Sequence, residues 1–507
     1  MIISGDRTIE AGELAGRAGR AAAALQALGI GAGDTVATLL RNDFPSFELL
    51  NAAGQLGALV VPINWHSVGP DVAYILQDSG ARLLVAHADL YRPLAASIPE
   101  GVKVCLVETP PEIAAAYNVS PDDAALRPGD LAWNTFRDSH EAGTLPPPAQ
   151  PGGSMMYTSG TTGRPKGVRR IVRSDTERAG LTEMLSTVFG FDDKPMKVAL
   201  TGPMYHSAPG AHAVMALAFG ADIVLQAKFE AEDLLALIEK HRITHLHVVP
   251  VMFIRLLKLP EDVRNRYDLS SLRFVTHGAA PCPRPAKLAM IEWWGPIIGE
   301  YYGSTETGAV TFCSADEYVA HPGTVGKALK RATVKVLDEN GMEVPRGTPG
   351  EVYARNGMVS DFTYQGDPAK RDACDRDGLI TAGDIGIMDE DGFLYLSDRK
   401  KDMIISGGVN IYPAQIEAAL AGCPGVRDCA VFGIPDDEFG ESVCAVIQPE
   451  ASTITADSVR AYLKGQVAGY MIPRRIEFRD DLPREATGKI FKRHLRDEFW
   501  RALGRAI

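Results

Sequence analysis

The segment Tyr157–Gly167 has the composition of a binding site for an anion. Its sequence, YTSGTTGRPKG, combines hydroxyl side chains, glycines and a lysine in a short stretch. Glycines allow several backbone N–H groups to turn toward one anion, hydroxyls add donors, and Lys166 adds a positive charge. The GK[ST] order of a Walker A loop is absent. A flexible surface loop is the alternative, but the composition predicts a phosphate-binding loop.

Carboxylates and a further lysine follow in four later segments. GEYYGSTETG (Gly299–Gly308) and TAGD (Thr381–Asp384) each contain an acid, PREATGK (Pro483–Lys489) ends on a lysine, and DRKKDMIISGGVNIYP (Asp398–Pro413) begins with a charge run. A carboxylate offers two acceptor oxygens to a ribose diol, and Mg²⁺ takes few carboxylates when phosphate oxygens fill its other positions. Each segment alone is also compatible with a turn or a solvated surface.

Together and in this order, the five segments resemble the signature segments of the adenylate-forming superfamily. This superfamily groups acyl-CoA synthetases, the adenylation domains of peptide synthetases and beetle luciferases. The resemblance extends over nearly the whole chain and favours the acyl-CoA synthetases. It implies ATP as the nucleotide, Mg²⁺ as its metal ion and coenzyme A as the acyl acceptor.

The resemblance assigns the contacts to the adenine, the phosphates and the metal ion. Tyr302 stacks on adenine, Thr305 contacts the α-phosphate and acts in catalysis, and Glu306 is the catalytic acid that holds Mg²⁺. The expected phosphate loop comprises Thr158, Ser159, Gly160, Thr161, Thr162, Gly163 and Lys166. The expected wall between adenine and the acyl group comprises Gly278, Ala279 and Ala280.

Three further polar residues complete the nucleotide site by resemblance. Asp384 and Arg399 bind the ribose, and Lys489 is the catalytic lysine. A mobile ammonium suits that role because negative charge develops between the attacking carboxylate and the α-phosphate. The chain departs from the family at Ala382, where a hydroxyl residue is usual, and Thr381 lies one place early.

The second half-reaction depends on the C-terminal part of the chain. The resemblance makes Lys401 the hinge, a position that absorbs a large change in backbone angles. Two glycines without side chains leave room for a slender pantetheine arm. The positions expected to contact coenzyme A are Ser406, Gly407, Gly408, Phe439 and Tyr470.

The acyl pocket is assigned to four positions, and His206, in the segment PMYH, gates it by resemblance. Small residues among these positions predict a roomy apolar cavity, an aromatic one predicts a flat wall, and we find no arginine placed for a second carboxylate. The expected substrate is a medium- or long-chain fatty acid or a bulky hydrophobic ring acid, with aryl acids such as cinnamates as the alternative. The four positions are Tyr301, Gly303, Gly308 and Ala309.

Other functions share this pattern. An adenylation enzyme that loads a carrier protein shares the first step, but we find no attached carrier segment and no aspartate placed for an amino group. A luciferase-like oxygenase shares the fold. A non-catalytic nucleotide-binding protein is disfavoured because Lys489, Glu306, Asp384 and Arg399 are all present. The preferred interpretation is an acid–CoA ligase that forms acyl-AMP, releases pyrophosphate and then makes a thioester.

The length and the element pattern predict two α/β domains. The 507 residues exceed one ordinary core. Strand-like and helix-like segments alternate between residues 13 and 86, which predicts a mostly parallel sheet covered by helices. After the charge run, strand-like pieces around a helix predict a small mobile α+β lid. We expect an N-terminal AMP- and acyl-binding domain at 1–400 and a lid domain at 401–507.

Composition restricts the partners. The formal net charge is −12, from 52 basic and 64 acidic side chains, which argues against a nucleic-acid or anionic-membrane partner. The seven cysteines form no CxxC pair, so neither a disulfide framework nor a zinc site is expected. The N-terminus does not resemble a signal peptide, and the most apolar stretch, Ala213–Gly220, is too short to span a bilayer. We expect a cytoplasmic enzyme that binds only small molecules; the oligomeric state stays open, a homodimer included.

Overall fold

The chain folds as two compact units. The computed structural model describes residues 1–146, 148, 152–158, 165–170, 175–399, 402–406, 409–436, 439–450, 454–464, 466–484 and 490–501. The first unit comprises Met1–Ala279, Gly303–Ala309 and Asn356–Asp375, and the second comprises Ala280–Tyr302, Val310–Arg355 and Arg376–Ile507. The second unit therefore includes residues on both sides of the expected boundary at 400/401, and that boundary stays a prediction.

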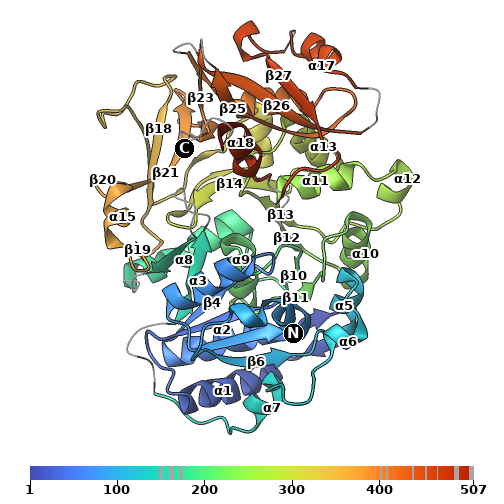
Figure 1. Cartoon of the computed structure of the whole chain (residues 1–507), viewed down its shortest axis with the longest axis vertical. Helices are drawn as coiled ribbons and strands as arrows, with labels where there is room; N and C mark the ends of the chain where they lie inside the picture. The colour runs from blue at the N-terminus through green and yellow to red at the C-terminus, as the bar shows by residue number, and fades with distance from the viewer. Residues whose placement is uncertain are drawn as a thin grey trace. The chain divides into compact units, whose positions relative to one another are not determined.

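The first unit contains a parallel sheet with the order β6-β5-β3-β4-β7, of which Figure 1 labels β4 and β6. All its neighbouring strands are parallel, and β3 and β5 are buried along their whole length, as expected for strands covered on both faces. This confirms the predicted α/β class. The strands and the helices between them are β3 (Thr35–Leu39), β4 (Leu59–Pro62), β5 (Leu83–His87), β6 (Lys103–Val107), β7 (Gly153–Ser154), α1 (Ala11–Ala27), α2 (Phe44–Leu56), α3 (Gly69–Ser79) and α7 (Trp133–Asp138).

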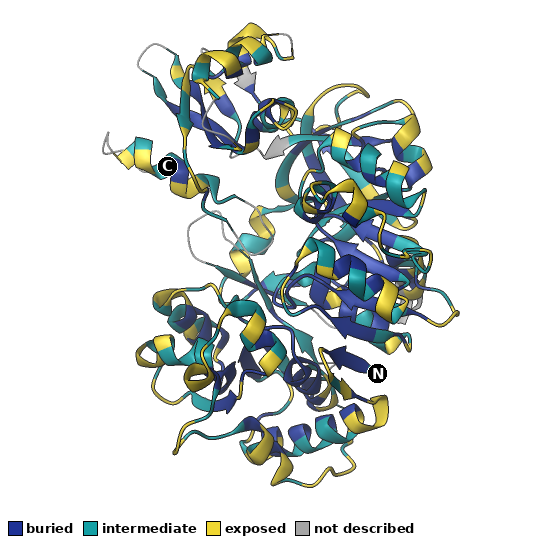
Figure 2. Ribbon diagram, turned by 90° about the vertical axis from the view of Figure 1, so that its right-hand side faces the viewer, coloured by how far each residue is buried: buried dark blue, intermediate teal, exposed yellow. Residues whose placement is uncertain are grey.

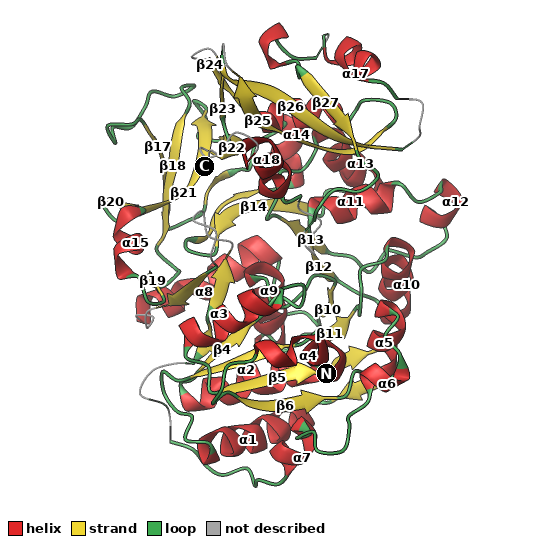
Figure 3. Ribbon diagram, viewed as in Figure 1, coloured by secondary structure: helices red, strands yellow, loops and turns green. Residues whose placement is uncertain are grey.

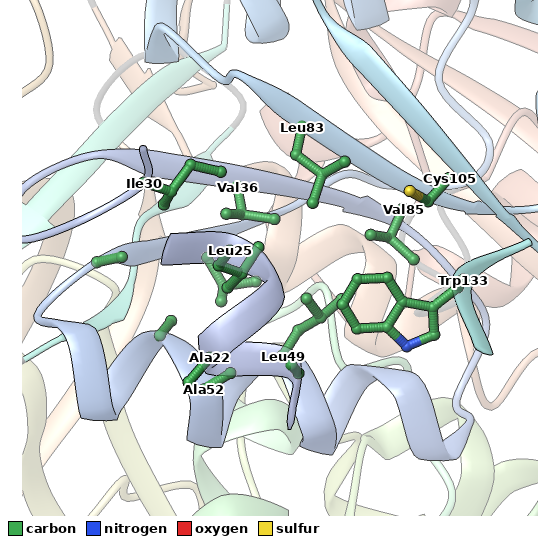
Figure 4. Packing of buried hydrophobic residues seen from close by; sticks show 14 of the residues in the cluster. Ala22, Leu25, Ile30, Val36, Leu49, Ala52, Leu83, Val85, Cys105 and Trp133 are labelled. Atoms are coloured by element: carbon green, nitrogen blue, oxygen red, sulfur yellow. The ribbon is translucent and has the colours of Figure 1, made fainter. Parts of the chain in front are cut away.

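The core of this region forms where α1 and α2 pack on one face of the sheet (Figure 4). Leu14, Ala18, Ala21 and Leu25 repeat at the helical period and form the buried face of α1. Gly57 ends α2 at φ 71°, a left-handed conformation that glycine adopts at little cost. Figure 2 shows buried residues concentrated along the strands and exposed residues on the outward sides of the helices.

A second group of strands in the first unit has the order β13-β12-β10-β11-β1-β2. Its pairs are parallel except for β1 and β2. Because side chains alternate along a strand, His245 and His247 of β12 lie on the same face. The elements are β1 (Ile2–Ser4), β2 (Arg7–Ile9), β10 (Lys197–Leu200), β11 (Asp222–Leu225), β12 (His245–Val248), β13 (Phe274–His277), α8 (Asp175–Phe189), α9 (Ser207–Ala218), α10 (Ala231–His241) and α11 (Pro250–Leu257).

A small antiparallel sheet in the first unit joins the predicted phosphate-loop segment to a distant strand. Its order is β19-β9-β8, with β8 at Met156–Thr158, β9 at Lys166–Arg170 and β19 at Phe362–Tyr364. The short helix α15 (Pro368–Ala373) follows β19.

The second unit carries two further sheets (Figure 3). One has the order β17-β18-β21-β20, with β22 antiparallel to β21, and the other has the order β24-β23-β26-β25, with β27 parallel to β26. The second of these, with its helices, is the predicted small α+β region. The elements are β14 (Ile298–Ser304), β15 (Gly308–Cys313), β17 (Ala332–Leu337), β18 (Gly350–Asn356), β20 (Asp375–Arg376), β21 (Leu379–Met388), β22 (Leu394–Arg399), β23 (Ile404–Ser406), β24 (Val409–Ile411), β25 (Val426–Asp436), β26 (Gly440–Pro449), β27 (Arg475–Phe478), α13 (Arg284–Trp294), α14 (Ala315–Ala320), α16 (Pro413–Leu420), α17 (Ala456–Leu463) and α18 (Lys492–Arg501).

No helix within the described ranges combines the length and the apolar character needed to cross a membrane.

A buried carboxylate holds the helices of the first core together. Glu48 of α2 is fully buried, and it accepts hydrogen bonds from Trp133 Nε1 at 2.9 Å and from Arg137 Nη1 at 2.8 and 2.9 Å. Arg17 of α1 donates to it at 3.3 Å and also pairs with the half-exposed Glu13 at 2.5 Å. A buried charge of this kind is tolerated only because its partners compensate it.

We therefore expect Glu48→Ala to lower the free energy of unfolding by about 3–5 kcal/mol, since it removes the buried carboxylate partner of Arg137, which keeps only the half-exposed Asp138. The control is Glu13→Ala, which removes an exposed partner of the same Arg17 and costs less than about 1 kcal/mol. Thermal unfolding of both variants measures the difference. Equal shifts in the midpoint would contradict the interpretation.

Candidate functional site

The ends of the predicted phosphate loop are held together by a strand pair. Thr158 of β8 lies opposite Lys166 of β9, and Tyr157 lies opposite Gly167. The loop positions Ser159, Gly160, Thr161, Thr162 and Gly163 lie outside the described residues. The antiparallel pairing therefore fixes where the loop begins and ends.

Tyr364 links the loop lysine to the predicted metal-binding acid. On β9, Lys166, Val168 and Arg170 share a face, and Tyr364 of β19 lies opposite Val168. The Lys166 ammonium is 5.2 Å from the centre of the Tyr364 ring, within range of a cation–π interaction. The Tyr364 hydroxyl donates to Glu306 Oε1 at 2.9 Å. Burial and the Glu306 carboxylate raise the pKa of Tyr364, so it remains a donor.

Arg170 fixes the backbone of the turn that carries the predicted catalytic residues. Its guanidinium donates to the carbonyl oxygens of Glu306 at 2.6 Å and of Ser360 at 2.9 Å, and also to that of Thr305. Within the turn, the Ser304 hydroxyl accepts from the backbone N–H of Thr307 at 3.1 Å. Three carbonyl groups from two segments are thereby oriented by one cation.

The first unit also brings the predicted gate close to this turn. Ser207, the first residue of α9, has its hydroxyl 3.1 Å from the Thr305 hydroxyl. His206 is the N-cap residue of α9, and its ring lies 4.5 Å from that of Tyr205. Contacts through Ser207 and Tyr364 therefore link the start of α9, the turn with Thr305 and Glu306, and Lys166.

The glycines assigned to the acyl pocket are required by close packing. A Cβ atom on Gly303 would lie 2.0 Å from the carbonyl oxygen of Gly308. Gly308 has φ +67°, and its Cβ would lie 2.8 Å from Val359 Cγ2. Close packing alone therefore requires glycine at these two positions, and the roomy cavity that we inferred from the small Gly308 and Ala309 stays a prediction. The Asn356 side-chain amide donates to the carbonyl oxygen of Ala309.

The second unit joins the predicted adenine and ribose residues. The Tyr302 hydroxyl donates to Asp384 Oδ2 at 2.7 Å. Asp384 lies on β21 opposite Arg399 of β22, whose side chain is not described. Burial raises the pKa of the neighbouring Tyr301. The Tyr302 ring packs against an apolar cluster of Val336, Val352, Met388 and Leu394.

The shifted hydroxyl of Thr381 has a structural role. It donates to Glu351 Oε1 at 2.9 Å and accepts from the backbone N–H of Gly383 at 2.9 Å. Gly383 has φ +79°, which a residue with a side chain rarely adopts. The Thr381 hydroxyl thus holds the turn that precedes Asp384, and Ala382 is exposed.

The remaining predicted residues are more dispersed. Gly278 is buried and Ala279 adopts φ +69°, so the predicted wall starts with a strained turn that continues into Ala280. Ser406 lies opposite Gly440, Tyr470 is 60% exposed, and the Arg474 guanidinium lies 4.1 Å from the Phe439 ring centre. Of these remaining predicted residues, four lie outside the described part of the chain, namely Lys401, Gly407, Gly408 and Lys489.

The donor set at Glu306 suits a metal ion that is bound mainly by phosphate. Among the described residues, no group of three or more His, Cys, Asp or Glu side chains could hold a metal ion. A single carboxylate beside a hydroxyl-rich turn fits Mg²⁺, which usually keeps one or two carboxylates and takes its other ligands from phosphate and water.

Two residues that contact the predicted site were not predicted from the sequence. Arg170 carried a weak signal, because it is four residues from Lys166 and strand alternation places both on one face. Tyr364 carried none, since its partner Glu306 is distant in sequence and only the pairing of β19 with β9 brings them together.

The loop segment closed by β8 and β9 and the contacts that join Lys166, Tyr364 and Glu306 lie in a chain of mixed α/β architecture, as expected for a nucleotide-binding enzyme. The family model described as AMP-binding enzyme matches residues 1–361, and the model described as AMP-binding enzyme C-terminal domain matches residues 415–489. The chain belongs to the AMP-binding enzyme family.

Curated and solved relatives cover almost the whole chain. A feruloyl-CoA synthase of Amycolatopsis sp is 33% identical over 96% of this chain and 93% of its own. A fatty acid–[acyl-carrier-protein] ligase of Streptomyces coeruleorubidus is 34% identical over 99% of this chain and 93% of its own. The crystal structure of ATP-bound MatB from Rhodopseudomonas palustris superimposes with a TM-score of 0.83 at 29% identity, covering 98% of this chain and 95% of that one.

The hydrogen bond from Tyr364 predicts a selective effect on metal-dependent nucleotide binding. Tyr364→Phe should weaken Mg²⁺-dependent ATP binding by roughly 10-fold, because residues that orient a metal ligand typically contribute this much. Calorimetric titration of ATP at several Mg²⁺ concentrations measures it. The control is Tyr267→Phe, which removes a hydrogen bond of the same 2.9 Å length to Glu232 of α10. If both variants bind ATP alike, Tyr364 does not orient a metal-binding carboxylate.

Proposed function

We propose that this chain is an ATP-dependent acid–thiol ligase of the acyl-CoA synthetase type. It activates a carboxylic acid as acyl-AMP with release of pyrophosphate and then transfers the acyl group to coenzyme A. The observation that supports this proposal is the chain of contacts from Lys166 through Tyr364 to Glu306, since it brings a carboxylate close to the cation at the end of the expected phosphate loop. The comparisons with acid–thiol ligases over almost the whole chain support it.

The first step is a nucleotidyl transfer. A carboxylate oxygen of the acid attacks the α-phosphorus of ATP, the bond to the bridging oxygen breaks, and pyrophosphate leaves with its electron pair. Lys166, Thr305 and Lys489 would bind and orient phosphate oxygens, and Glu306 would hold Mg²⁺, which neutralises part of the triphosphate charge. Positioning and charge neutralisation are the main contributions a protein makes to such transfers.

Tyr302 and Asp384 would hold the nucleoside through both steps. Asp384 offers acceptor oxygens to the ribose hydroxyls. Its hydrogen bond to Tyr302 orients the carboxylate beside the ring that would stack on adenine. The adenylate would therefore keep its place while the second substrate enters.

The second step is an acyl transfer to sulfur. The thiol sulfur attacks the acyl carbonyl carbon, the carbon–oxygen bond to phosphate breaks, and AMP leaves. We infer that the residues after Lys401 change position between the steps, so that Lys489 is replaced by the segment Ser406–Gly408. Phe439 and Tyr470 would then contact coenzyme A.

The acyl substrate and the acceptor are the finer parts of this proposal. We favour a medium- or long-chain fatty acid or a hydrophobic ring acid, aryl acids included, because relatives are named for ferulate and for fatty acids. The second relative makes a carrier-protein thiol the alternative acceptor, and parallel assays with coenzyme A and with a carrier protein separate the two. The cytoplasmic setting and the homodimer stay predictions from the sequence.

The role proposed for Lys489 predicts that its substitution affects the two half-reactions to different extents. Lys489→Ala should slow acyl-AMP formation by roughly two to four orders of magnitude, the effect of losing a key charge stabiliser, while thioester formation from supplied acyl-AMP changes far less. Pyrophosphate release and thioester formation are assayed separately. The control is Lys492→Ala, because Lys492 pairs with Glu417 at 2.8 Å and has no proposed catalytic role. Equal loss in both half-reactions of the Lys489 variant would exclude the assignment.

The hinge assignment predicts the opposite pattern, in which acyl-AMP formation is kept and the transfer to coenzyme A is slowed. Proline fixes φ near −65° and restricts the preceding residue, so Lys401→Pro should hold the hinge in one state. We expect near-normal acyl-AMP formation and transfer to coenzyme A slowed by about 10²-fold or more. Lys401→Ala removes only the charge and should be mild in both steps. A proline variant that loses both half-reactions together, or neither, would overturn the hinge, and a melting curve excludes global damage.

A further inference from the structure

Two polar side chains in the first unit are fully buried without a hydrogen-bond partner among the described residues. They are His212 of α9, at both ring nitrogens, and Thr276 of β13, at its hydroxyl. An unsatisfied buried donor or acceptor destabilises a fold by about as much as several exposed contacts contribute, so such groups are rare. A buried group of this kind is explained when a ligand supplies its partner.

The two groups belong to one cluster. His247 of β12 lies opposite Thr276 of β13, and its ring lies 5.7 Å from the His212 ring. The rings of Phe189 and Phe191 lie 5.0 and 5.4 Å from His212. The cluster therefore consists of hydrogen-bonding groups surrounded by aromatic side chains.

Burial keeps these imidazoles uncharged. It lowers the pKa of His212 well below its usual value, with the neighbouring histidines as a further cause, and it lowers the pKa of His247 to about 4. A neutral imidazole has one donor and one acceptor nitrogen, and a threonine hydroxyl can do both. The cluster therefore offers complementary partners to an uncharged group, and no compensation for a carboxylate.

The cluster is connected to the predicted acyl positions through α8. Asn356, which donates to the carbonyl oxygen of Ala309, also lies 3.3 Å from the sulfur of Met184 on α8. Phe189, which packs on His212, is five residues further along the same helix, a rise of about 7.5 Å. On the other side, α9 begins at Ser207 beside Thr305 and carries His212 in its second turn.

From these contacts we propose that His212 and Thr276 bind an uncharged hydrogen-bonding group, such as a hydroxyl, at the end of the acyl substrate remote from its carboxylate. The inference rests on the proposed function and narrows its substrate class. The substrate is then a predominantly apolar acid, aromatic or aliphatic, that carries a hydroxyl or an equivalent neutral group about one ring or a short chain away from the reacting carboxylate. Dicarboxylic acids are excluded by the same chemistry.

The experiment uses pairs of acids that differ only in one hydroxyl group. The first pair is cinnamic acid and 4-hydroxycinnamic acid, and the second is octanoic acid and its ω-hydroxy derivative. Acid-dependent pyrophosphate release gives kcat/KM for each. We expect the full-length enzyme to prefer the hydroxylated member of at least one pair by on the order of 10⁴-fold, since a site built to bind a hydroxyl rejects the analogue that lacks it.

Two variants test the residues themselves. His212→Phe and the near-isosteric Thr276→Val should each reduce that preference to within about threefold, mainly by losing activity toward the hydroxylated acid. Because both changes remove unpaired buried groups, neither should lower the melting temperature. A purely structural role would lower the melting temperature and leave the preference unchanged.

The matched control is His245→Phe on the same sheet face. His245 contacts the carbonyl oxygen of Gly190 at 3.0 Å and the Thr244 hydroxyl at 2.8 Å, so its nitrogens are occupied. This variant should lose stability and keep the hydroxyl preference. The inference is overturned if the unaltered enzyme activates these acids without preference, or if His212→Phe and Thr276→Val keep the preference. If no acid of a broad panel releases pyrophosphate, the proposed function itself fails.

Discussion

The hydrogen bond from the Tyr364 hydroxyl to Glu306 joins segments that are far apart in the chain, and the arrangement of Glu306 relative to Lys166 depends on it. Glu306 lies on a turn between β14 and β15, and Tyr364 lies on β19 beside the strand that starts at Lys166. A site that uses both a cation and a metal-binding acid for the phosphates of ATP must hold the two close together without a direct ion pair between them. The tyrosine achieves this here, since it contacts the acid through its hydroxyl and the lysine through its ring. Arg170 adds rigidity by orienting the carbonyl groups of the same turn.

The α/β class and the candidate site segments could be predicted from the sequence, because the residues that indicate them are concentrated in short segments. Hydroxyls, glycines and a lysine within one loop indicate phosphate binding whatever the fold, and alternating strands and helices indicate a parallel sheet, which β3, β4 and β5 confirm. Tyr364 could not be predicted, because a cross-strand contact between distant segments leaves no local pattern. The packing around the glycines at 303 and 308 could not be predicted for a related reason. A glycine in a sequence is compatible with an open cavity and with neighbouring atoms occupying that space. Here a backbone carbonyl oxygen lies beside Gly303 and the Val359 side chain lies beside Gly308.

Buried polar groups in the first unit fall into two classes that differ in how they are satisfied. Three side chains donate hydrogen bonds to Glu48, so its burial supports the helix packing. His212 and Thr276 have none among the described residues, so their burial is a cost to the fold. Buried polar groups without a partner are expected where function opposes stability, and they concentrate at binding sites. The same reasoning applied to His245, whose nitrogens are both occupied, gives a structural role.

The electrostatics of the two ends of the proposed substrate are therefore opposite. In the proposed mechanism, the reacting carboxylate would meet Lys166, Lys489 and the metal ion, where negative charge is stabilised. The remote end would meet aromatic rings and imidazoles that burial keeps neutral, where a charge would be left without compensation. An acid with one carboxylate can bind in only one orientation under these conditions, since the reverse orientation places its charge in the apolar end. Selectivity for the direction of binding would then follow from desolvation, and selectivity among acids from the few hydrogen bonds available at the remote end.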